Sequence, residues 1–223
     1  MASSTIARAS TLMAVGTTAS RVLGFVKAMV LATAIGVTAS VGADSFAVGN
    51  MIPNSVYMVL IGGVLSAVLV PQIVQAMAGH DGGSAYVNKL VTIAMVFLLA
   101  ITALAMAFAP LLVRLYAMAW SPEQLALAVG FAYWCLPQIF FYGLFNILGE
   151  VLNAKKVFGP SSWAPVLNNV VAITGLVIYI ALFGADPDGN RGLGDWHEAQ
   201  IALLAGSATL GVIAQAIILS VAW

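Results

Sequence analysis

Long uncharged stretches dominate this chain of 223 residues and are separated by short charged connectors. The two longest cover 36 positions before Asp81 and 29 positions before Asp186. A helix rises about 1.5 Å per residue and needs roughly 20 residues to cross the hydrocarbon core of a bilayer. The pattern therefore predicts an all-α, polytopic membrane protein. Six transmembrane helices are expected, over residues 12–36, 44–78, 88–113, 124–153, 161–184 and 198–223.

Prolines and glycines interrupt the second of these helices, which is too long for one straight span. Pro53, Gly62, Gly63 and Pro71 all lie inside it. Proline removes a backbone donor and kinks a helix, and broken membrane helices occur where the backbone lines protein or a water-filled cavity. Pro53, Gly62 and Gly63 are therefore predicted hinges.

Composition supports a membrane protein and excludes several other classes. Hydrophobic residues make up 62% of the chain and charged residues 7%, against about 25% charged residues in a typical soluble domain. The 8 Lys and Arg balance the 8 Asp and Glu, so no basic surface for nucleic acid is expected. Cys135 is the only cysteine, and neither His80 nor His197 has further ligands at metal-site spacing. With no nucleophilic triad or paired carboxylates either, we expect no metal site, no cofactor and no enzyme.

Lysines and arginines predict the orientation of the chain. Cytoplasmic connectors of membrane proteins carry an excess of positive charge. A cytoplasmic N-terminus puts four basic residues inside and two outside; these are Arg8, Lys89, Lys155 and Lys156, and Arg114 and Arg191. The segment 189–194 is then expected to be a solvated exterior loop.

Arg21 and Lys27 lie inside the first predicted helix, where a cation costs on the order of 3 kcal/mol unless it faces protein or water. Two structural explanations are open: Arg21 extends to the inner headgroups, and Lys27 pairs with Asp44. The functional explanation is a cationic cavity for an anionic headgroup such as a phosphate. Six positions separate the two cations, which is a rotation of about 120°, so a bend at Gly24 would be needed to bring them together.

Uncharged polar residues within or near the spans suit the sugar or amide groups of such a ligand, but amides also commonly join membrane helices. They are Asn50, Asn54, Ser55, Gln138, Asn146, Asn153, Asn168 and Asn169. Asp44 opens the second helix, where two compatible roles are expected. One is the N-cap of that helix. The other is a gating residue or a counter-ion for Lys27 or Arg21.

Four motifs, in this order, resemble the start of the MviN/MurJ lipid II flippases, members of the multidrug/oligosaccharidyl-lipid/polysaccharide exporter superfamily. They are SRVLGFVK at 20–27, ADSF at 43–46, IPN at 52–54 and GGVLSAVLVP at 62–71. Residues 152–168 resemble the linker between that family's fourth and fifth helices. The likeness therefore extends through most of the chain.

The resemblance implies one lobe of a transporter in the bacterial plasma membrane. Its two lobes would alternately expose a central cationic cavity and move undecaprenyl-pyrophosphate-linked disaccharide-pentapeptide to the outer leaflet for peptidoglycan synthesis. Arg21 and Lys27 would bind the pyrophosphate, Asp44 would gate or balance charge, and Asn54 would contact the headgroup. Residues 1–223 are expected to be the N-terminal lobe, with the missing C-terminal lobe, membrane lipids and cell-wall synthesis proteins as partners.

Several positions depart from the family pattern. Lys27 stands where the family usually has an arginine, and Ala28 where it often has an acidic residue. Gly62 stands where some members have a glutamate. Tyr57 and Met58 stand where relatives often carry paired arginines. One cavity cation is thus missing. Two other functions stay open: an exporter of another lipid-linked oligosaccharide or of drugs, and a non-transporting membrane scaffold for cell-wall synthesis. A drug exporter would favour an acidic cavity, which argues against that option.

Overall fold

The computed structural model describes residues 2–37, 40–60 and 84–223, and its regular elements in these ranges are all helices. Eight of them are α-helices and one is a short 3₁₀ turn. They are α1 (Ala2–Ile35), α2 (Val41–Leu60), α4 (Ser84–Ala107), α5 (Ala109–Tyr116), α6 (Pro122–Cys135), α7 (Gln138–Ala154), α8 (Gly159–Phe183), η2 (Leu193–Asp195) and α9 (Glu198–Ala222).

Within the described ranges, five helical stretches are long and apolar enough to cross a membrane. They are Thr11–Ile35, Tyr86–Ala107, Pro122–Ala154, Gly159–Phe183 and Glu198–Ala222. The prediction of an all-α, polytopic membrane protein is confirmed. The count differs from the six predicted spans because the range 44–78 is described only as far as Leu60, and Gly62, Gly63 and Pro71 lie outside the described residues.

Prolines divide two of the predicted spans. Residues 88–113 do not form one helix, because α4 ends at Ala107 and α5 starts at Ala109, with Pro110 in the first turn of α5. Residues 124–153 are divided at Pro137, between the end of α6 and the start of α7. In both places proline lacks the backbone N–H that would continue the helical hydrogen bonds.

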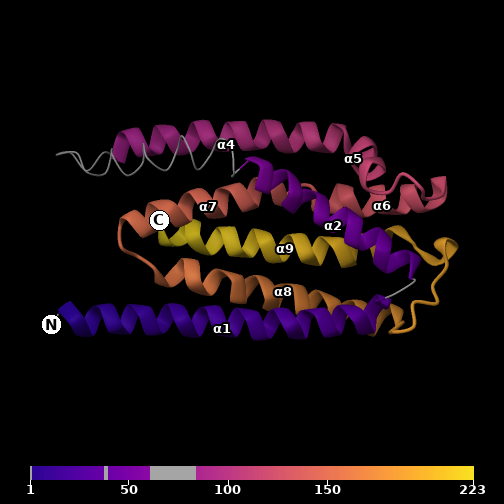
Figure 1. The fold of residues 1–223 in the computed structure, drawn as a ribbon, viewed down its shortest axis with the longest axis horizontal. Coiled ribbons are helices and arrows are strands. Elements are labelled where there is room, and N and C mark those ends of the chain that lie inside the picture. The colour runs from indigo at the N-terminus through magenta and orange to yellow at the C-terminus, as the bar shows by residue number, and fades with distance from the viewer. Residues whose placement is uncertain (1, 38–39, 61–83) are drawn as a thin grey trace.

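The helices lie side by side in an elongated bundle (Figure 1). Helix α1 packs along α8, α8 along α9, and α9 against α6 and α7, while α2 crosses α6. Figure 1 shows α2 starting near the C-terminal end of α1 and diverging from it, toward α4 on the opposite side of the bundle. Helices α1 and α2 therefore meet at one end only.

Arg191 joins the ends of α1 and α8, although the loop that contains it was predicted to be a solvated exterior loop. Its Nη2 donates to the carbonyl oxygens of Phe183 and Gly184, each at 2.8 Å. Its Nη1 donates to the carbonyl oxygen of Ala34 at 3.1 Å and to the Tyr179 hydroxyl at 3.2 Å. Helix C-termini present unsatisfied carbonyls that a cation stabilises. The prediction was wrong for Arg191, which is half-buried between two helix ends.

A close approach of α8 and α9 depends on Gly175. A Cβ atom added at Gly175 would lie 2.1 Å from the Cβ atom of Ser207 and 3.4 Å from its Cα atom. Small residues let membrane helices approach each other, which increases their van der Waals contact. By contrast, a Cβ atom at Gly149 of α7 would make an ordinary contact, 3.8 Å from Leu219.

We expect Gly175→Ala to destabilise the bundle by about 1–3 kcal/mol, because the added methyl group forces α8 and α9 apart. Gly149→Ala is the matched control and should be neutral or stabilise by up to about 1 kcal/mol, through its higher helix propensity. Thermal unfolding of the purified protein in detergent measures both. Equal midpoints for the two variants would contradict the close α8–α9 contact.

Candidate functional site

A groove of about 450 Å³ lies between α1 and α2, near the end where the two helices meet. Helix α1 contributes Leu31 and Ile35 to its lining, and α2 contributes Phe46, Asn50 and Met51. Most of the lining is apolar, and Asn50 supplies an amide. Its lining residues Ala28 and Ala43 are the sequence neighbours of Lys27 and Asp44.

Arg21 and Lys27 lie on α1 beside the groove and outside its lining. Lys27 is half-buried and precedes the lining residue Leu31 by four positions, which is about one helical turn. Arg21 is exposed and precedes the lining residue Ala28 by seven positions, so it lies about two turns away on nearly the same face. Both cations thus precede the groove along α1, but α1 is continuous between them, so the rotation of about 120° that separates their side chains remains.

Asp44 lies in the first turn of α2 and is not its N-cap. Helix α2 begins at Val41, and the Ser40 hydroxyl accepts a hydrogen bond from the backbone N–H of Ala43 at 3.2 Å. Ser40 therefore caps the helix, and the prediction for Asp44 was wrong by four residues. In the first turn the carboxylate still faces the positive end of the helix dipole. In the described part of the chain, Asp44 makes no ion pair with Lys27.

Asn54 shares an exposed face of α2 with Asp44. Asp44, Ala47, Met51 and Asn54 follow one another at spacings of three and four residues, and all four are exposed. Ala47 and Met51 line the groove, so this face continues the groove along α2. Pro53 lies buried within α2, which stays helical on both sides of it.

Helix α1 continues through Gly24 without a break, and this part of the helix is bound to α8. The side-chain amide of Asn169 donates to the carbonyl oxygen of Ser20 at 2.9 Å. A Cβ atom at Gly24 would lie 3.8 Å from the same amide nitrogen. The neighbouring Asn168 donates in a different direction, to Oε1 of Gln215 on α9, at 2.9 Å. These two amides join helices, as one of the two open explanations predicted.

Gln138 forms a buried polar cluster that joins α2, α7 and α9. Its side-chain nitrogen donates to Oδ1 of Asn50 at 3.2 Å and to the Thr209 hydroxyl at 2.9 Å. Its Oε1 accepts from the Tyr142 hydroxyl at 3.1 Å. Gln138 is 1% exposed, and the Thr209 hydroxyl in turn donates to the carbonyl oxygen of Trp134 at 2.7 Å. The sequence identified the amide of Gln138 but not its central position.

Tyr57, where the resemblance implies an arginine, packs against an aromatic side chain. Its ring centroid lies 5.4 Å from that of Tyr142, and the hydroxyl of Tyr142 bonds to Gln138. The next residue, Met58, is 62% exposed. This position therefore contributes packing and no positive charge.

Charged and amide side chains lie beside the α1–α2 groove. Two cations and a carboxylate flank the groove, and amides of α2 lie within it and beside it. No group of three or more His, Cys, Asp or Glu side chains gathers among the described residues. A cation in a partly dehydrated site attracts an anion more strongly than it does in water.

Comparison with known proteins identifies the family of this chain. The model of the family described as lipid II flippase MurJ matches residues 31–222. A lipid II flippase MurJ of Burkholderia cenocepacia is 32% identical over 162 residues, which cover 71% of this chain and 31% of that protein. A probable lipid II flippase MurJ of Haemophilus influenzae is 28% identical over 183 residues, which cover 76% of this chain and 35% of that protein. The chain thus spans about a third of the length of these relatives.

A solved structure has the same fold. It is a lipid II flippase MurJ in an inward closed conformation, with a TM-score of 0.69 and 22% sequence identity. The match covers 92% of this chain and 40% of that chain.

We expect Gln138→Leu to destabilise the protein by about 1–3 kcal/mol, because it removes the shared partner of buried polar groups on α2 and α9. Gln124→Leu on α6 is a control of the same chemical change at a half-buried position. Thermal unfolding of both variants tests this. An unchanged midpoint for Gln138→Leu would show that the cluster contributes little to stability.

Proposed function

The chain belongs to the lipid II flippase MurJ family, and we propose that it forms the N-terminal lobe, residues 1–223, of a transporter for lipid II. The cargo is an undecaprenyl-pyrophosphate-linked disaccharide-pentapeptide, which would cross the inner membrane for peptidoglycan synthesis without bond chemistry. The family match over residues 31–222 carries the proposal. The cations beside the α1–α2 groove support it.

Arg21 and Lys27 would bind the pyrophosphate. Both lie on α1 at a depth where a cation is stable only beside protein, water or an anion, and the described residues give Lys27 no carboxylate partner. A pyrophosphate offers several acceptor oxygens to such donors. Asn54 would contact the headgroup, and Asp44, on the same face of α2, would gate the site or balance its charge.

Alternating access would follow from rocking of this lobe against the second lobe around a site near the bilayer midplane. Pro53, Gly62 and Gly63 would be hinges in the second span. A bend at Gly24 would also have to break the bonds from Asn169 to Ser20, because these hold the same turn of α1 against α8. The second lobe and cell-wall synthesis proteins are the proposed protein partners.

A non-transporting scaffold is the second candidate function. The packing of Tyr57 against Tyr142 favours it, because an aromatic contact occupies the position where the resemblance implies a cation. A scaffold would keep its activity without the cations of α1. The complementation experiment below separates the two functions.

The N-terminus is proposed to lie in the cytoplasm. In Figure 1 the N-terminus of α1, the start of α4 and the α7–α8 connection lie at one end of the bundle, and the α8–α9 loop lies at the other. The first end carries Lys89, Lys155 and Lys156, so the excess of positive charge lies on one side, as expected for the inner face.

We expect Lys27→Ala to abolish rescue of bacterial cells depleted of their own lipid II flippase. A hydrogen bond to a charged group contributes about 1.5–3 kcal/mol, so its loss weakens headgroup binding by roughly ten- to a hundredfold. Lys27→Arg keeps the charge and should rescue, and Arg114→Ala, outside the site, should rescue as well. Growth is measured at matched protein levels, using the full-length protein. Full rescue by Lys27→Ala would exclude Lys27 from transport and favour the scaffold.

Cysteine labelling in intact cells tests the orientation. Cys135 is 0% exposed, so a membrane-impermeant maleimide should give little background from it. Asp188→Cys in the α8–α9 loop should react in intact cells. Lys155→Cys should react only after the membrane is permeabilised. The reverse pattern would place the N-terminus outside.

A further inference from the structure

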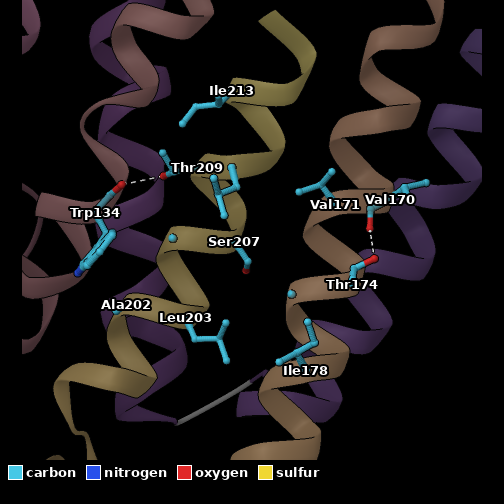
Figure 2. Close-up of a pocket in the computed structure, with 13 residues that line it drawn as sticks. Trp134, Val170, Val171, Thr174, Ile178, Ala202, Leu203, Ser207, Thr209 and Ile213 are labelled. Atoms are coloured by element: carbon cyan, nitrogen blue, oxygen red, sulfur yellow. Dashed lines mark hydrogen bonds between the residues drawn. The ribbon is translucent and has the colours of Figure 1, made fainter. Parts of the chain in front are cut away.

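A second groove, of about 490 Å³, lies between α8 and α9 and extends to Trp134 of α6. Figure 2 shows Val171 and Ile178 of α8 and Leu203 of α9 pointing into the space between the two helices. None of its lining residues belongs to α1 or α2, so it is separate from the groove described above. Both α8 and α9 are candidate membrane spans, and the groove therefore lies at membrane depth.

The hydroxyl groups of this groove already donate to backbone carbonyls. Thr174 donates to the carbonyl oxygen of Val170 at 2.9 Å, and Ser207 to that of Leu204 at 3.0 Å. Thr209 donates to that of Trp134 at 2.7 Å (Figure 2). A polar ligand would therefore find few free donors here. Aliphatic and aromatic side chains supply the remaining contacts, which suit a hydrocarbon chain.

A more polar groove adjoins the first at the N-terminal end of α9. It has a volume of about 510 Å³, and Trp134 and Ala202 line both grooves. Tyr133 and Glu198 also line it, and Glu198 is exposed in the first turn of α9. Tyrosine and tryptophan favour the boundary between headgroups and acyl chains. The two grooves together thus have an apolar part within the membrane and a carboxylate at the headgroup level.

We propose that these grooves bind a phospholipid with an ammonium headgroup, phosphatidylethanolamine. One acyl chain lies between α8 and α9, and the ammonium group lies beside the carboxylate of Glu198. Charge selects this lipid, because Glu198 lines the polar groove while neither groove is lined by a lysine or arginine. An anionic phospholipid or a prenyl pyrophosphate would meet a carboxylate and no cation. The proposal does not depend on transport of lipid II.

Photocrosslinking of the full-length protein tests the proposal. The protein is placed in vesicles of phosphatidylethanolamine and phosphatidylglycerol that contain a trace of lipid with a diazirine in one acyl chain. The photoreactive lipid carries one or the other headgroup, and the labelled peptides are identified by mass spectrometry. We expect the phosphatidylethanolamine probe to label residues 170–178 and 203–213 several times more than the phosphatidylglycerol probe.

Two matched pairs of variants locate the lipid. Ile178→Trp fills the groove and should lower labelling severalfold. Val177→Trp should not lower it, because Val177 does not line the groove. The two side chains are similarly exposed, Ile178 at 45% and Val177 at 53%. Glu198→Gln should make the two probes equal, while Glu123→Gln in the first turn of α6 should keep the preference. Thermal unfolding confirms that all four variants are folded.

Three results would overturn the proposal. Equal labelling of the unmodified protein by both headgroups would remove the role of Glu198. Absence of label on α8 and α9 would show that another protein segment covers the groove. Stronger labelling by an undecaprenyl phosphate probe with the same photoreactive group would assign the groove to the prenyl chain of a transport substrate.

Discussion

Polar contacts between apolar helices hold this structure together. Lipid chains are as apolar as leucine side chains, so the hydrophobic effect gives membrane helices little reason to associate. Here Asn168 and Asn169 of α8 bind α9 and α1, and Gln138 joins α7 to α2 and α9. The close approach at Gly175 adds van der Waals contact between α8 and α9. The bond from Asn169 to Ser20, together with packing along α8, fixes the position of α1, the helix that carries Lys27.

The sequence predicted the architecture because membrane insertion imposes a strong rule: each span must be long and uncharged. The same rule made Arg21 and Lys27 conspicuous as candidate ligands. The resemblance to MviN/MurJ proteins supplied the family, which the comparison confirmed. The proposed roles of Arg21, Lys27, Asp44 and Asn54 rest on the resemblance and on their places beside the groove.

Tertiary contacts explain what the sequence did not predict. Aspartate is a common N-cap residue, but the residue that caps α2 is Ser40, because the helix starts four residues before the predicted position. Arg191 has the sequence surroundings of a solvated loop, and only the folded chain brings the carbonyl of Ala34 within its reach. The side-chain amides in the spans also need the folded chain to be interpreted. Their number suggested a ligand-binding site, but Asn168, Asn169 and Gln138 each form a hydrogen bond to another helix.

The guanidinium of Arg191 fastens the C-terminal ends of α1 and α8 at the same point. This makes the fastened end a fulcrum for α1. The helix has 34 residues and is thus about 50 Å long, so it acts as a lever arm. A tilt of about 5° around this fulcrum moves the far end of α1 by about 4 Å and the fastened end hardly at all. A tilt of this kind would also have to break the bond from Asn169 to Ser20, and its displacement would be largest at the N-terminal end of α1.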